Sequence, residues 1–122
     1  MSSSNAYSHE LHVHTEPRDT AVVAEIAGNI DTVTADDLLT ALQAVIGDGH
    51  VRLVGDMSKV GYTSSAGLRA LLGAMKEARR GGGDLRLAAV GDKVMQVLKL
   101  SGFTSILRLY PDVDAALASF AD

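Results

Sequence analysis

The sequence predicts an α/β fold with a mixed sheet of about five strands and about four helices, in the order β-β-α-β-α-β-α-β-α. Three observations lead to this prediction. Two segments that alternate apolar and polar residues open the chain, short apolar runs then alternate with amphipathic segments, and glycine or aspartate marks the junctions between them. Strands joined through helices run parallel, so we expect a parallel sheet with an antiparallel start.

The first two strands are expected at residues 10–15 and 21–27. Leu11 and Val13 alternate with polar neighbours, which is typical of a strand that is buried on one face. Residues 17–20 between the two segments have the composition of a turn. The pattern therefore predicts a hairpin.

A first helix is expected from about residue 35 to residue 46. Leu38 and Leu42 lie at helical spacing, and two nearby glycines follow the segment. Thr34 and Asp37 approximate a capping box, which predicts that Thr34 caps the helix.

The remaining elements follow as strand, helix, strand, helix, strand and helix. They are expected as a strand at 51–57, a helix at 65–80, a strand at 85–90, a short helix capped by Asp92, a strand at 106–109 and a helix after Pro111 and Asp112. The glycine triplet at 81–83 supplies the left-handed stop that the longest of these helices requires.

The length of the chain, 122 residues, fits one domain with a real core. The serine-rich residues 1–8 are expected to form a flexible tail, and residues 9–122 are expected to form the single domain. No apolar run approaches the roughly 20 residues that a membrane helix needs, and the start lacks the pattern of a signal peptide. These observations predict a cytoplasmic protein with no membrane span.

The charge and residue usage exclude several classes of site. A formal net charge of −4 and scattered basic residues disfavour direct binding of nucleic acid. The absence of cysteine excludes disulfides and thiolate metal sites. His9, His12 and His14 lack the partners that complete a typical metal shell, so no metal and no cofactor are expected. The sequence contains none of the usual hydrolase, phosphate-loop or dinucleotide motifs, which argues against an enzyme with catalytic residues.

Hydroxyl side chains gather where the predicted strand at 51–57 leads into the helix at 65–80. Thr63, Ser64 and Ser65 lie at the helix N-terminus, where free N–H groups and the helix dipole favour an anion. One interpretation is that Ser64 or Ser65 serves only as the N-cap. The other is that one hydroxyl is phosphorylated, and the two interpretations are compatible.

Three segments in order, Gly28-Asn29-Ile30-Asp31, Asp56-Met57-Ser58-Lys59-Val60 and Ser64-Ser65-Ala66-Gly67-Leu68, resemble the STAS family of anti-sigma-factor antagonists. The resemblance continues through residues 82–87 and 94–103 and covers roughly residues 10–120. It implies a STAS-like form of the predicted sheet.

The phosphorylated loop of this family usually reads Asp-Ser-Ser-Gly, and a kinase-like anti-sigma factor phosphorylates the first serine. Aligned on Gly67, the resemblance puts Ser64 at the aspartate position, Ser65 at the phosphorylated position and Ala66 at the second serine position. It therefore implies Ser65 as the phosphoacceptor. Because the aspartate is missing, Ser64 and Thr63 are the alternatives.

The function implied by the resemblance is an anti-sigma factor antagonist that binds a kinase-like anti-sigma factor, is switched off by serine phosphorylation and is reset by a serine phosphatase. The residues expected at the partner surface are Asp31, Tyr62, Ser64, Ser65, Gly67, Leu68 and Arg69. Asp31 could equally be a turn residue before a helix, and the Tyr62 ring could pack on the protein's own core. The alternative function is a STAS subunit of another signalling or lipid-transport complex, constitutive or ligand-regulated.

Overall fold

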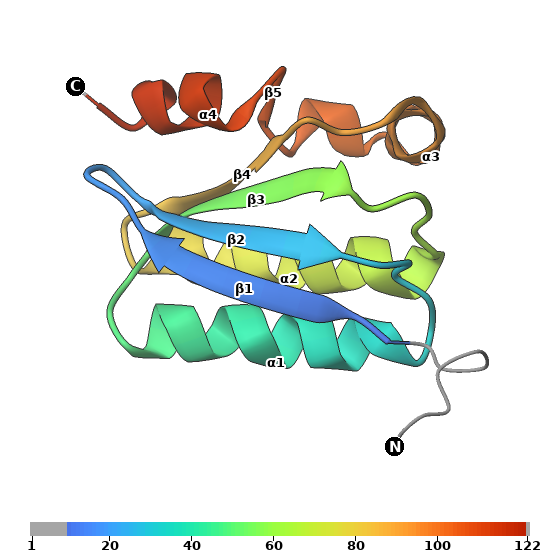
Figure 1. Cartoon of the computed structure of the whole chain (residues 1–122), viewed down its shortest axis with the longest axis horizontal. Helices are drawn as coiled ribbons and strands as arrows, with labels where there is room; N and C mark the ends of the chain where they lie inside the picture. The colour runs from blue at the N-terminus through green and yellow to red at the C-terminus, as the bar shows by residue number, and fades with distance from the viewer. Residues whose placement is uncertain (1–9, 122) are drawn as a thin grey trace.

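A computed structural model describes residues 10–121 and contains a five-stranded mixed sheet with helices on both faces (Figure 1). The strands lie in the order β1-β2-β3-β4-β5, with β1 antiparallel to β2 and every later neighbour parallel. The predicted fold class and element order are confirmed. The expected tail at residues 1–8 lies outside the described residues.

The strands are β1 (His12–Pro17), β2 (Val22–Ala27), β3 (Arg52–Lys59), β4 (Asp84–Ala88) and β5 (Leu109–Tyr110). The helices are α1 (Thr34–Gly47), α2 (Ser65–Arg80), α3 (Asp92–Leu100) and α4 (Val113–Ser119), with a short 3-10 helix η2 (Phe103–Ser105). α2 has the predicted bounds. The last strand is shorter and begins later than predicted, because the Ile106 and Leu107 N–H groups bond back to the Phe103 carbonyl in a turn, and only two residues pair with β4.

The two faces of the sheet bury different side chains. Along β2, Ala24 and Ile26 point into the larger core beneath α1 and α2, whereas Val23 points into a smaller core beneath α4. This alternation follows from the period of two of a strand. Figure 1 shows α1 and α2 on one side of the sheet and α4 on the other. No helix within residues 10–121 is long and apolar enough to cross a membrane.

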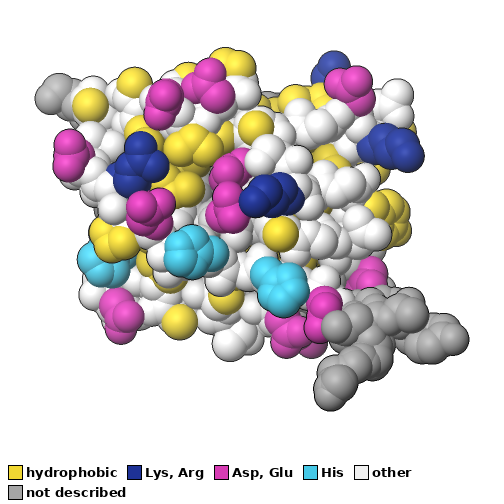
Figure 2. Space-filling model, in the orientation of Figure 1, with side chains coloured by type: hydrophobic (Ala, Val, Ile, Leu, Met, Phe, Trp, Pro, Cys, Tyr) yellow, Lys and Arg dark blue, Asp and Glu magenta, His cyan; other side chains and the backbone are white. Residues whose placement is uncertain are grey.

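The outward side chains of β1 are exposed and are not covered by a helix. His12 and His14 are exposed on β1, as the alternating pattern predicts. Figure 2 shows histidine and acidic side chains gathered on this side of the molecule. Within residues 10–121 no group of three His, Asp or Glu side chains is arranged to hold a metal ion, and His9 lies outside those residues.

Candidate functional site

Two loops at the same edge of the sheet are bonded to each other. The Ile30 N–H donates to the Tyr62 carbonyl at 2.9 Å, and the Ser64 N–H donates to the Ile30 carbonyl at 2.7 Å. These bonds form an isolated parallel bridge between Ile30 and Thr63. The loop after β2 and the loop before α2 therefore lie side by side, at the ends of two parallel strands.

The neighbouring serines at the start of α2 have different roles. Ser64 has an extended backbone, and its Oγ accepts a hydrogen bond from the Gly67 N–H at 3.2 Å, so Ser64 is the N-cap. Ser65 is the first residue of the helix and is exposed. Within residues 10–121 its hydroxyl has no hydrogen-bond partner. The sequence left open which of the two serines caps the helix. The structure assigns the cap to Ser64 and leaves the Ser65 hydroxyl exposed.

Thr63, the third hydroxyl of the loop, is buried. It is only 2 % exposed, and its hydroxyl donates to the Ser64 carbonyl at 3.2 Å. Its hydroxyl is therefore inaccessible from solvent in this structure. Of the three candidate acceptors, Ser65 is the most accessible.

Asp31 caps the start of α1 in the structure. Its Oδ1 accepts from the Val33 and Thr34 N–H groups, each at 2.9 Å, and its carbonyl accepts from the Ala35 N–H at 2.9 Å. The interpretation of Asp31 as a turn residue that precedes a helix therefore agrees with its hydrogen bonds.

The predicted capping role of Thr34 is wrong. Thr34 is a buried helical residue, and its hydroxyl turns back to the loop, where it donates to the Asn29 carbonyl at 3.0 Å and accepts from the Asp31 N–H at 2.9 Å. The capping-box pattern missed this arrangement because both Asp31 and Thr34 can cap, and the loop geometry selects between them.

The seven expected partner residues divide by burial. Tyr62, Ser65 and Arg69 are exposed, Asp31 and Ser64 are half-buried, and Gly67 and Leu68 are buried. The Tyr62 side chain is 50 % exposed, so its ring is not packed into the core. Leu68 contributes to the main core instead of the surface.

Val33 is a surface residue that sequence reasoning did not single out. It is 62 % exposed, and it lies in the loop that the Ile30 bridge holds against the Tyr62 loop. An apolar side chain directly after a polar capping turn was the signal that could have identified it. Val33 and Tyr62 give the two bonded loops exposed apolar surface.

The charges near Ser65 favour an added anion. The first turn of α2 contains no acidic residue. No carboxylate of that turn therefore offsets the positive end of the helix dipole or occupies its free N–H groups. Arg69 is exposed and lies four residues after Ser65, on the same side of the helix. This edge can present a hydroxyl, apolar surface and a cation to a partner.

Comparisons with known proteins agree on one family. The STAS domain family model matches residues 12–116. A Bordetella bronchiseptica protein, BtrV, that carries the name of an anti-sigma factor antagonist is 34 % identical over 102 residues, which are 84 % of this chain and 88 % of that protein.

Two solved structures extend the comparison. The crystal structure of an anti-sigma factor antagonist from Mycobacterium paratuberculosis has a TM-score of 0.85 and 31 % identity, covering 93 % of this chain and 97 % of that one. A sulfate transporter family protein from Wolinella succinogenes has a TM-score of 0.69 and 28 % identity, covering 80 % and 81 %.

Proposed function

We propose that this chain, which belongs to the STAS domain family of anti-sigma factor antagonists, binds a kinase-like anti-sigma factor and is released from it when Ser65 is phosphorylated. The observation that carries the proposal is the exposed Ser65 hydroxyl at the start of α2, beside a serine that is already engaged as the cap. The resemblance of residues 64–68 to the phosphorylated loop of the family supports the same residue. The proposed setting is the cytoplasm, where ATP is available to the kinase.

The unmodified surface suits a protein partner. Tyr62 and Val33 supply apolar area, and Arg69 supplies a cation beside the free hydroxyl of Ser65. Aromatic residues and arginine are enriched at protein interfaces. We infer that these side chains form the contact with the anti-sigma factor.

Phosphorylation changes this surface by charge. The kinase transfers the terminal phosphoryl group of ATP to the Ser65 Oγ, the hydroxyl proton leaves to a base of the kinase, and ADP departs. The phosphate adds about 1.5 to 2 negative charges to a surface that is apolar in part. It also lies one helical turn before Arg69 and can pair with that guanidinium, which removes the cation from the partner. The N-terminus of α2 tolerates the charge, so the fold persists.

A serine phosphatase restores the unmodified serine by hydrolysis of the phosphoserine ester. Water attacks phosphorus, the Ser65 Oγ regains its proton, and inorganic phosphate leaves. The chain itself supplies no catalytic group in this cycle. It is the substrate of both enzymes.

Labelling with the cognate kinase tests the proposal. Mass spectrometry is expected to place a single phosphate on Ser65. Ser65→Ala should abolish the label and keep partner binding, whereas Ser65→Asp should weaken binding, because a carboxylate imitates part of the added charge. Ser64→Ala is the matched control and should still be labelled. A label that persists on Ser64 or Thr63 in Ser65→Ala would reject Ser65 as the acceptor.

A second candidate function is a STAS part of another signalling or transport assembly, including lipid transport. The similarity to a sulfate transporter family protein favours it, and so does the serine at the position where the antagonist loop carries aspartate. In that case Ser65→Asp would leave partner affinity unchanged. Affinity purification would recover transport subunits in place of a kinase-like protein.

A further inference from the structure

A basic hollow lies at the sheet edge formed by β4 and β5, away from the Ser65 loop. It has a volume of about 770 Å³, within the usual range for small-ligand sites, and is open to solvent on one side. Arg79, near the C-terminal end of α2, lines it, whereas Ser65 begins that helix. Arg79 lies fourteen positions after Ser65 along the helix, a rise of roughly 21 Å. The hollow is therefore a second site.

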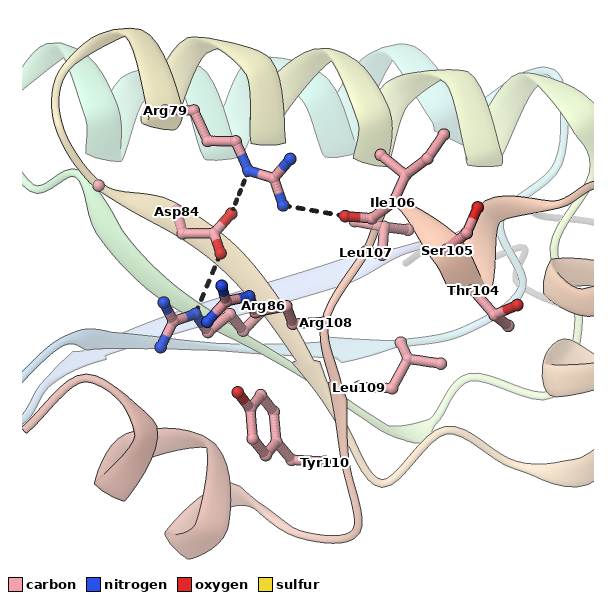
Figure 3. Close-up of a pocket in the computed structure, with 11 residues that line it drawn as sticks. Arg79, Asp84, Arg86, Thr104, Ser105, Ile106, Leu107, Arg108, Leu109 and Tyr110 are labelled. Carbon is pink, nitrogen blue, oxygen red and sulfur yellow. Dashed lines mark hydrogen bonds and ion pairs between the residues drawn. The ribbon is translucent and has the colours of Figure 1, made fainter.

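Two of its arginines are held in place by one buried carboxylate. The Arg79 Nε donates to Asp84 Oδ1 at 2.8 Å, and the Arg86 Nε donates to Asp84 Oδ2 at 3.0 Å (Figure 3). Asp84 is 5 % exposed. Arg86 also donates to the Ser119 carbonyl and hydroxyl, each at 2.8 Å, and its guanidinium stacks over the Phe120 ring at 4.0 Å. Arg86 is thus fixed before any ligand arrives.

A third arginine adds charge that no carboxylate balances. Arg108 lines the hollow, is exposed, and has no ion pair with any carboxylate of residues 10–121. The hollow therefore holds three guanidinium groups against the single carboxylate of Asp84. The excess is two positive charges, in a chain whose formal net charge is −4. Figure 3 shows the Arg86 and Arg108 side chains next to each other.

The phenol of Tyr110 lines the same hollow as Arg86 and Arg108. A hydrogen bond with Ser119 lowers the pKa of its phenol most, and the charges of Arg86 and Arg108 act in the same direction. Asp84 offsets part of the Arg86 charge, whereas Arg108 has no carboxylate partner within residues 10–121, so net positive charge remains beside the phenol.

We propose that this hollow binds the phosphate group of a small soluble molecule between Arg86 and Arg108, with the Tyr110 hydroxyl as a further donor. Arginine matches phosphate oxygens through paired N–H groups. A phosphate carries up to about two negative charges, which balances the excess, whereas a carboxylate carries one. The proposal does not depend on Ser65.

Nuclear magnetic resonance titration of the full chain at constant ionic strength tests the site. The probes are inorganic phosphate and glycerol phosphate, with acetate for comparison. Either phosphate probe is expected to give saturable amide shifts around Arg86 and Tyr110, and tighter binding of glycerol phosphate would identify an esterified ligand. Acetate binding as tight as phosphate binding, or shifts that never saturate with either phosphate, would overturn the proposal.

Charge variants separate a defined site from general attraction. Arg108→Gln should weaken phosphate binding about tenfold, because one charge-assisted hydrogen bond is lost. Tyr110→Phe should weaken it less. Arg18→Gln removes the same charge from the turn between β1 and β2, outside the hollow, and should leave binding unchanged. Equal losses in Arg18→Gln and Arg108→Gln would overturn the proposal, and unchanged binding in Ser65→Ala would separate it from the switch.

Discussion

The backbone of α2 at Gly67 packs directly against the side chain of Ile30. A Cβ atom at position 67 would lie 2.6 Å from the Ile30 Cγ2 and would also collide with the Thr63 Oγ1. Ile30 is fully buried and bridges the two loops of the candidate site. The glycine therefore lets the start of α2 approach the loop after β2, which brings the Ser65 region and Val33 to one edge.

Gly67→Ala is expected to destabilise the protein by about 1 to 3 kcal/mol, because the added methyl group overpacks this contact. Gly73→Ala is the matched control in the same helix. Its Cβ would meet only Leu39, at an ordinary 3.7 Å, so this variant should be stabilised by about 0.5 to 1 kcal/mol. Urea denaturation measures both. Equal changes in the free energy of unfolding for Gly67→Ala and Gly73→Ala would show that the close contact with Ile30 does not determine the effect of the added methyl group.

Ser64 is expected to act on stability and not on phosphate acceptance. Ser64→Ala removes the cap on the Gly67 N–H and should cost about 1 kcal/mol of unfolding free energy. Ser64→Asp restores a capping carboxylate at the positive end of the helix and should keep or raise stability. Kinase labelling of Ser65 should persist in both variants. Loss of the label in a folded Ser64→Ala protein would contradict the separation of the two roles.

Arg69 is expected to pair with the phosphate once Ser65 is modified. A neighbouring cation favours the doubly charged phosphate, so it lowers the second pKa of the phosphoserine. Phosphorus NMR titration of the phosphorylated protein measures this pKa, which should rise in Arg69→Gln. Arg80→Gln removes a charge at the far end of α2 and should leave it unchanged. A phosphoserine pKa that is the same in all three proteins would argue against the pairing.

The phenol of Tyr110 is expected to ionise below its ordinary pKa of 10.0, because a hydrogen bond with Ser119 and the charges of Arg86 and Arg108 favour the phenolate. Since the folded pKa is the lower one, the ionised phenol contributes stability fully above pH 10 and loses it as the pH falls through the folded pKa.

The difference in ultraviolet absorbance between the wild-type protein and Tyr110→Phe isolates this titration. The midpoint of the titration should lie below pH 10.0. The midpoint should rise when the same difference is measured between Arg108→Gln and the double variant Arg108→Gln/Tyr110→Phe. A midpoint at or above 10.0 in the wild-type background would show that these cations do not act on the phenol.

Local patterns in the sequence were sufficient for the order of elements. Apolar residues at a period of two predicted β1 and β2, and the helical stripe with its glycine stop predicted α2 over residues 65–80. These signals are strong because each follows from the burial of apolar side chains at regular spacing. The last strand was placed too early, because a short edge strand carries little periodic signal and the first residues of the apolar segment, Ile106 and Leu107, form a turn.

Contacts between distant segments decided the details of both sites. The bond from the Ser64 N–H to the Ile30 carbonyl holds Ser64 extended, so its hydroxyl turns to the Gly67 N–H and Ser65 stays free. No local rule distinguishes two adjacent serines, since either can cap a helix. In the same way, Arg86 and Arg108 are far apart in the sequence and meet only because β5 pairs with β4. The sequence by itself determined the order of the elements through local periodicity and the family loop through its residues, whereas long-range backbone pairing decided which hydroxyl is exposed and where positive charge accumulates.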